Sequence, residues 1–251
     1  MNLGPYFERI RWTGGRTDLA GILAAHMRAI PFENFDVLLG RRPRLDLEGL
    51  EAKLVTARRG GYCYEHSTLF AAVLAELGIA CKTHSARVVM MTPREQAPRT
   101  HMFLTVGNDV LDPGFGGFAP MVPVPVGGSA GVHRIVRDGD VIALEIEQGS
   151  KWLRLWVSTL EHDHPIDFEM ANHFTATHTA SPFTSRIMAR AFLPDGKVTI
   201  ANRDLTITRG SDVEARVLAD RGELRAVVAE YWGFDLPELE TLRVPSISDW
   251  H

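Results

Sequence analysis

The chain has 251 residues, with 27 basic and 31 acidic side chains and a formal net charge of −4 when histidine is neutral. This length can bury a sizeable core without disulfides, and two cysteines with no signal peptide favour a reducing, cytoplasmic setting. Basic residues are scattered and no run of about 18 apolar residues occurs, so we expect neither nucleic acid nor a membrane as a partner.

The first third of the chain shows apolar side chains at helical spacing. A run over 17–30 has this pattern, and Asp46 can cap a second helix over 47–59. A third apolar run begins at Cys63 and ends at Gly78, a residue typical of the position that follows a helix. Cys63 is therefore expected at the N-terminus of a helix.

From about Lys82 the apolar period shortens to two, which predicts strands. Asp138-Gly139 and Gln148-Gly149-Ser150 are turn signals between alternating runs, so this part is predicted to be a meander or a small barrel. Two more strands are expected over 192–210, and an amphipathic helix over 222–234. Helices, an antiparallel sheet and a mixed C-terminal segment together predict the α+β class.

Cys63 stands in the stretch "RRGGYCYEHSTLF", where it has three possible roles: packing, metal ligation or nucleophilic attack. A nucleophilic cysteine reacts as a thiolate, which the positive end of a helix dipole stabilises. Gly60 and Gly61 would let the backbone approach a substrate closely. The local sequence is therefore compatible with a reactive thiol.

A thiolate of this kind needs a histidine as its ion-pair partner and proton donor. His101, in "RTHMFLTV", begins a strand, and Asp112, in "VLDPGFGG", follows on the next one. The two can be cross-strand neighbours if Gly107-Asn108 is the hairpin turn, and a carboxylate there would fix the imidazole orientation. The order is Cys-His-Asp, although on spacing alone a structural thiol beside unrelated residues stays open as the alternative.

Several blocks resemble one family. The segment 59–65, Arg-Gly-Gly-Tyr-Cys-Tyr-Glu, is similar to the active-site signature of the arylamine N-acetyltransferases. Three more blocks follow in the family's order, "AIPFENFDVLLGR", "RTHMFLTV" and "VLDPGFGGFAP". A further stretch, "DFEMANHFTATHTASPF", extends the likeness into the second half of the chain.

The resemblance implies a helical domain over 1–81, a β-barrel domain over 82–184 and a small α/β lid over 185–251, with a core like that of cysteine proteases. It implies a ping-pong reaction in which acetyl-CoA acylates the cysteine and an arylamine, hydrazine or N-hydroxyarylamine takes the acetyl group. Carried over to this chain, Cys63 is the nucleophile, His101 the base and later acid, and Asp112 the orienting group.

The resemblance also implies substrate contacts. Phe32 and Phe115 match aromatic residues that line the acceptor pocket, although plain packing is the other interpretation. Thr100 and Gly116 match positions near coenzyme A, although a strand edge and a turn would explain them as well.

Other charged or metal-binding groups lie near these blocks or further along the chain. Arg59 and Glu65 flank Cys63 and could form an ion pair that braces it. His162 and His164 share one loop, which makes an incomplete metal site, so no metal is expected.

Two positions depart from the family's pattern. Ser67 stands where the family commonly has asparagine, which predicts altered local hydrogen bonding. Pro113 follows Asp112 and has no backbone N–H, so the loop there is expected to be stiffer or displaced. A shift of this kind could turn the carboxylate away from the imidazole.

Alternative functions stay open at this point. An amide synthase of the same family, or a cysteine hydrolase of the papain or transglutaminase type, would use the same three residues. A catalytically idle binding module is the third class. The expected partners are a coenzyme A thioester and an aromatic amine or hydrazine, bound by a monomer or a homodimer.

Overall fold

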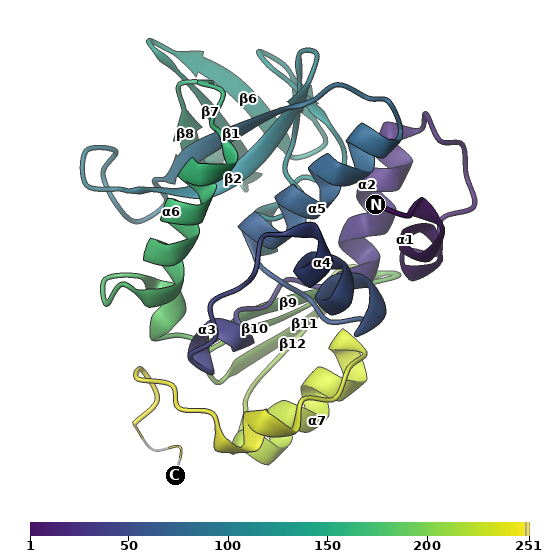
Figure 1. Ribbon diagram of the computed structural model, residues 1–251. Helices are drawn as coiled ribbons and strands as arrows, with labels where there is room; N and C mark the ends of the chain where they lie inside the picture. Colours follow the sequence, from purple (N-terminus) through teal and green to yellow (C-terminus); the bar gives the residue numbers. More distant parts are fainter. Residues whose placement is uncertain (249, 251) are drawn as a thin grey trace.

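The computed structural model describes residues 1–248 and 250. An eight-stranded antiparallel sheet and a four-stranded sheet lie on either side of the N-terminal helices, which include α2 and α5 (Figure 1). This arrangement confirms the predicted α+β class, in the order helices, barrel and C-terminal sheet with its helix.

The N-terminal part is helical. Its helices are α1 (Leu3–Arg9), α2 (Leu19–Ala29), α3 (Phe35–Leu38), α4 (Leu47–Leu50), the π-helical segment η1 (Glu51–Thr56) and α5 (Cys63–Glu76). The Asp46 side chain accepts a hydrogen bond from the N–H of Gly49 at 3.0 Å, so it caps α4 as predicted. Gly78 follows α5 with a φ of 73°, a conformation that glycine adopts without strain.

The central part is a nearly closed antiparallel barrel with strand order β4-β3-β2-β1-β8-β7-β6-β5. Its strands are β1 (Lys82–Val88), β2 (Arg99–Val106), β3 (Asp109–Leu111), β4 (Val124–Pro125), β5 (Ser129–Ala130), β6 (His133–Asp138), β7 (Val141–Gln148) and β8 (Lys151–Ser158). A bridge between Val126 and Ile135 brings the two ends of the sheet together. Inside, the rings of Phe103 and Trp156 stack with centroids 4.4 Å apart.

The C-terminal part begins with a helix along the side of the barrel (Figure 1). Its elements are α6 (Pro165–Thr177), the 3-10 helix η3 (Pro182–Thr184), β9 (Met188–Leu193), β10 (Gly196–Ala201), β11 (Asp204–Arg209), β12 (Asp212–Val217), α7 (Arg221–Trp232) and the 3-10 helix η4 (Pro237–Thr241). The two strands predicted over 192–210 are β10 and β11, and β9 and β12, which were not predicted, flank them to make a sheet of four. We call this sheet with α7 the lid.

The segment after α2 joins the three parts of the fold. Phe32 exchanges two backbone hydrogen bonds of 2.9 Å with Arg190 of β9 and forms a bridge with Gly61, two residues before α5. The indole N–H of Trp232, on α7, also donates to the carbonyl of Phe32 at 3.2 Å. The lid is thus hydrogen-bonded to the backbone that leads into the candidate nucleophile. No helix among residues 1–248 is both long and apolar enough to cross a membrane.

Candidate active site

Cys63 is the first residue of α5 and is 3% exposed. The backbone before it is tightly packed, because a Cβ at Gly60 would lie 2.2 Å from the carbonyl oxygen of Pro31. The Cys63 thiol lies 3.8 Å from the carbonyl oxygen of Thr100, at the start of β2. The N-terminus of α5 therefore presents the thiol to the start of β2, the strand that carries His101.

Gly114 brings a second loop against the nucleophile. A Cβ at this position would lie 2.5 Å from Cα of Cys63, a distance that no side chain tolerates. The loop after Asp112 can pack on Cys63 only because residue 114 is glycine.

His101 and Asp112 are hydrogen-bonded. Nε2 of His101 lies 3.0 and 2.9 Å from the two carboxylate oxygens of Asp112. The β2–β3 hairpin turns at Gly107-Asn108, and its register pairs Leu104 with Leu111. Extended by one pair, that register sets Asp112 opposite Phe103, so His101 and Asp112 are diagonal neighbours on one face rather than direct partners.

Trp156 adds a contact that the sequence did not indicate. Its indole N–H donates to Asp112 at 2.9 Å from the far side of the barrel. The carboxylate is fully buried, and it accepts hydrogen bonds from two rings at once. No local motif marks Trp156, because it is one apolar residue in an alternating strand.

The electrostatics favour a charged imidazole. Burial by itself lowers the pKa of His101, but the Asp112 carboxylate and a hydrogen bond with Cys63 raise this pKa to about 10. Since Nε2 faces Asp112, Nδ1 is the ring nitrogen left for the thiol. At neutral pH the site therefore presents an imidazolium to the thiol, the partner that a nucleophilic cysteine needs.

A buried ion cluster lies behind the nucleophile, with different pairs from the one expected. Arg59 binds Glu33 and Asp36, each at 2.7 Å, whereas Glu65 binds Lys53 at 2.7 Å. The expected Arg59–Glu65 pair is therefore wrong. Glu65 also accepts the backbone N–H of Tyr62 at 3.1 Å, which holds the first turn of α5.

The four residues expected to contact substrates surround this centre. Phe115 packs edge-on against His101 with ring centroids 4.8 Å apart. A Cβ at Gly116, whose φ is 65°, would lie 3.6 Å from the ring of Phe32. The carbonyl oxygen of Thr100 makes the contact with the Cys63 thiol described above. Their roles toward a substrate stay predictions.

The rings of His162 and His164 have centroids 5.4 Å apart. Within the described part of the chain, no three His, Cys, Asp or Glu side chains gather where they could hold a metal ion.

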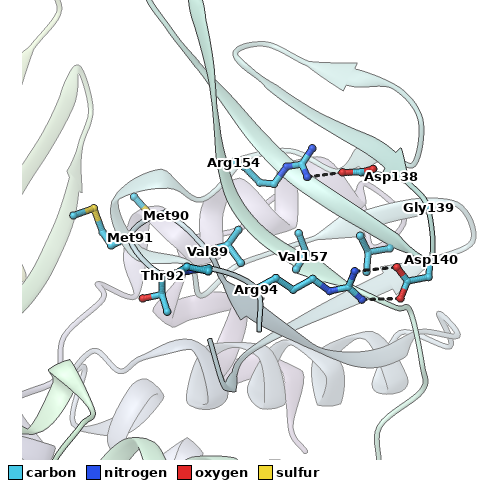
Figure 2. Close-up of a pocket in the computed structure, with 12 residues that line it drawn as sticks. Val89, Met90, Met91, Thr92, Arg94, Asp138, Gly139, Asp140, Arg154 and Val157 are labelled. Carbon is cyan, nitrogen blue, oxygen red and sulfur yellow. Dashed lines mark hydrogen bonds and ion pairs between the residues drawn. The ribbon is translucent and has the colours of Figure 1, made fainter. Parts of the chain in front are cut away.

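A hollow of about 710 Å³ lies on the outer side of the barrel, away from the three catalytic candidates. Figure 2 shows Arg94 paired with Asp140 and Arg154 paired with Asp138 at its edge. These charges pair with each other, and none of the three catalytic candidates lines this hollow.

Known proteins resemble this chain over most of its length. A family model described as N-acetyltransferase matches residues 17–241. The arylamine N-acetyltransferase of Escherichia coli is 34% identical, covering 94% of this chain and 90% of the relative. That of Mycolicibacterium smegmatis is 36% identical, covering 95% and 94%. The chain belongs to the arylamine N-acetyltransferase family.

A solved relative matches the fold. The structure of Mycobacterium marinum arylamine N-acetyltransferase in complex with CoA has a TM-score of 0.86 and 30% identity, covering 95% of this chain and 94% of that one. The family resemblance drawn from the sequence motifs is therefore confirmed.

The two departures from the family's pattern have visible consequences. The Ser67 hydroxyl donates to the carbonyl of Met102 at 2.8 Å, which ties α5 to β2. Pro113 is buried beside the nucleophile, yet Asp112 keeps both hydrogen bonds to Nε2 of His101. The proline therefore does not turn the carboxylate away from the imidazole.

Proposed function

We propose that this chain transfers an acetyl group from acetyl-CoA to an arylamine, a hydrazine or an N-hydroxyarylamine, through a thioester on Cys63. The observation that carries the proposal is the arrangement of His101 between the buried Asp112 carboxylate and the thiol at the start of α5. Membership of the family supports the same activity.

In the first half-reaction the Cys63 thiolate attacks the acetyl carbonyl of acetyl-CoA. The carbon–sulfur bond to coenzyme A breaks, and the leaving thiolate takes the proton from Nδ1 of the His101 imidazolium. Asp112 holds the ring with its two oxygens at Nε2, so Nδ1 stays aimed at the sulfur atoms. The products are acetylated Cys63, neutral His101 and free coenzyme A.

In the second half-reaction the neutral amine attacks the thioester. Neutral His101 accepts the proton that the amine loses, and the Cys63 thiolate leaves. The thiolate–imidazolium pair is then restored. Buried surroundings disfavour water as the competing acceptor, since Cys63, His101 and Asp112 are each at most 3% exposed.

Substrate contacts follow from the same geometry. We assign Phe32 and Phe115 to the aromatic acceptor because Phe115 packs against His101 and Phe32 lies beside Gly116 in the loop after Asp112. We assign Thr100 and Gly116 to coenzyme A because Thr100 contacts Cys63 and Gly116 lies in the loop after Asp112. The relative from Mycobacterium marinum has been solved with CoA, which supports coenzyme A as the donor. We propose a cytoplasmic monomer or homodimer.

The test is acetylation of the enzyme by acetyl-CoA alone. We expect one thiol of coenzyme A released per active site, an acetyl group on Cys63 by mass spectrometry, and a thioester that persists until an arylamine is added. Cys63→Ser should release almost none and keep the melting temperature of the parent. A thioester that water removes as fast as an amine would instead indicate a hydrolase, and acetylation of Cys63→Ser at the parent rate would remove Cys63 from the mechanism.

A further inference from the structure

Arg190 is a buried guanidinium that the mechanism above does not use. It lies on β9 of the lid, is 4% exposed, and its Nε and Nη1 have no hydrogen-bond partner anywhere in residues 1–248 and 250. A buried charge without a partner is costly, because desolvation is not offset by an ion pair. Such a group indicates a missing anion.

The position of Arg190 places that anion at the acceptor side of the site. Its backbone is hydrogen-bonded to Phe32 in both directions at 2.9 Å, and its guanidinium lies 4.0 Å over the ring of Phe192. Asp112 is near enough to attract it, although that carboxylate already accepts hydrogen bonds from His101 and Trp156. The free nitrogens therefore border the aromatic surroundings of the catalytic centre.

A second cation shares this face of the lid. Thr199 of β10 is the direct partner of Arg190, so Lys197 is its diagonal neighbour on the same side of the sheet. The Lys197 ammonium is half-buried and donates to the carbonyl of Gly117 at 3.4 Å. Burial and the nearby Arg190 lower the pKa of Lys197, and burial lowers the pKa of Arg190 to about 9. Arg190 stays charged at neutral pH, and an anion between the two groups would relieve its repulsion with Lys197.

We propose that Arg190, assisted by Lys197, forms a subsite for a carboxylate on the aromatic acceptor. The guanidinium would bind the carboxylate while the ring lies against the phenylalanines and the amine faces the Cys63 thioester. The pantetheine arm keeps the phosphates of coenzyme A far from its sulfur, whereas Arg190 lies close to Asp112. An acceptor carboxylate therefore fits this place better than a phosphate. This inference rests on the proposed function and deepens it.

The experiment compares 4-aminobenzoate with its neutral analogue 4-aminobenzamide, with acetyl-CoA as donor. In a ping-pong reaction kcat/KM for the acceptor reports only the second half-reaction, and kcat/KM for acetyl-CoA only the first. Arg190→Gln should lower kcat/KM for 4-aminobenzoate about 10- to 100-fold and leave the values for 4-aminobenzamide and acetyl-CoA within about twofold. Lys197→Met should give a smaller loss of the same selectivity.

Two measurements separate this role from a structural one. Benzoate, which cannot be acetylated, should inhibit the parent competitively against the acceptor, and Arg190→Gln should abolish this inhibition. Arg209→Gln is the matched control, because Arg209 is an exposed cation on the same sheet, 3.9 Å from Asp195. It should change none of these values.

Equal losses for both acceptors, or a selective loss for acetyl-CoA, would overturn the inference. A selective loss for acetyl-CoA would mean that Arg190 binds an anionic group of coenzyme A. If Arg190→Gln does not fold, an unchanged preference in Lys197→Met together with no inhibition of the parent by benzoate overturns it as well. Failure of the proposed function is distinct from all of these, since the parent would then form no thioester at Cys63.

Discussion

At the scale of single residues, we propose that Asp112 determines which nitrogen of His101 exchanges a proton with sulfur. Its two oxygens face Nε2, and Trp156 holds the carboxylate from behind at 2.9 Å. A proton on Nε2 is thereby fixed, which leaves Nδ1 for exchange with sulfur. The geometry therefore indicates that this carboxylate mainly orients the imidazole.

Asp112→Asn tests that task. The amide group can donate to Nε2 and stabilise the tautomer with its proton on Nδ1, which cannot accept a proton from the thiol. We expect single-turnover acetylation of Cys63 to slow about 10²- to 10⁴-fold while the melting temperature changes little. Trp156→Phe keeps the carboxylate and should cost less. If the asparagine variant is acetylated at the parent rate, Cys63 and His101 act as a dyad and Asp112 has no part in catalysis.

His101→Gln tests the ion pair. The raised pKa of His101, about 10, keeps the imidazolium present at neutral pH and removes it only as the pH rises through that value. In the parent, alkylation of Cys63 by iodoacetamide should therefore stay fast into mildly acidic solution. In the variant the midpoint of the rate-against-pH curve should move upward by more than one unit, about tenfold in rate at neutral pH.

Cys81→Ser is the background for these alkylation measurements, because it leaves Cys63 as the only thiol. Cys81 is half-buried, and burial raises the pKa of its thiol. Without the substitution, its alkylation would add a second rise at higher pH to the rate-against-pH curve. Identical curves for His101→Gln and its parent would mean that His101 does not pair with Cys63.

At the scale of elements, a chain of buried rings joins the first helices to the helix of the nucleophile. The Tyr6 hydroxyl donates to Nδ1 of His26 at 2.9 Å, and Nε2 of His26 donates to Nδ1 of His66 at 2.9 Å. Nε2 of His66 then donates to the carbonyl of Pro31 at 3.3 Å. Every nitrogen is satisfied when both histidines are neutral, so α1, α2 and α5 are linked without any charge.

This chain predicts acid sensitivity. Burial lowers the pKa of His66 to about 3 and that of His26 well below its usual value, so both stay neutral in the folded protein but become protonated in the unfolded one. The stability is complete above about pH 6.5 and falls as the pH drops toward 3, by up to about 1.4 kcal/mol per pH unit for each histidine.

Urea unfolding between pH 7 and 4 measures that slope. His66→Gln removes one of the two protons taken up on unfolding, so its slope should be shallower whatever its stability at pH 7. His173→Gln, at an exposed position of α6, is the control and should keep the parent slope. Parallel curves for His66→Gln and the parent would mean that the unfolded state does not gain this proton.

At the scale of the whole molecule, Asn34 fastens the lid to the helical part. Its amide group donates to the carbonyls of Phe183 and Arg186 at 2.9 and 2.8 Å, and its oxygen accepts the N–H of Met188 at 2.9 Å. All three bonds cross from the segment after α2 to η3, the loop that follows it and the first residue of the lid. One buried side chain thus satisfies three backbone groups that lie about 150 positions later in sequence.

Asn34→Ala should lower the free energy of unfolding by about 2–4 kcal/mol, because it leaves those backbone groups buried without partners. Chemical denaturation measures the loss. Asn108→Ala removes an exposed amide that makes one bond of 3.3 Å and should change stability by less than about 0.5 kcal/mol. A loss for Asn34→Ala as small as that of the control would show that the three bonds contribute little to holding the lid.

Much of the architecture was readable from the sequence by itself. Apolar periodicity separated the helical part from the strands, Asp46 and Gly78 marked helix ends, and Gly107-Asn108 marked the hairpin. These signals are local, since they depend on capping, on turn conformation and on which face of one element is buried. The motif around Cys63 identified the family for the same reason, as its residues are contiguous.

Only the tertiary structure decided the contacts between distant segments. Trp156 reaches Asp112 across the barrel, Lys53 rather than Arg59 binds Glu65, and two guanidinium nitrogens of Arg190 are buried with no hydrogen-bond partner in the described part of the chain. The sequence likewise indicated β10 and β11 but not β9 and β12, because pairing with neighbours stabilises a strand whose own pattern is weak. The physical reason is common to all of these: each depends on burial and on partners brought close by the fold, and neither quantity is present in any short stretch of sequence.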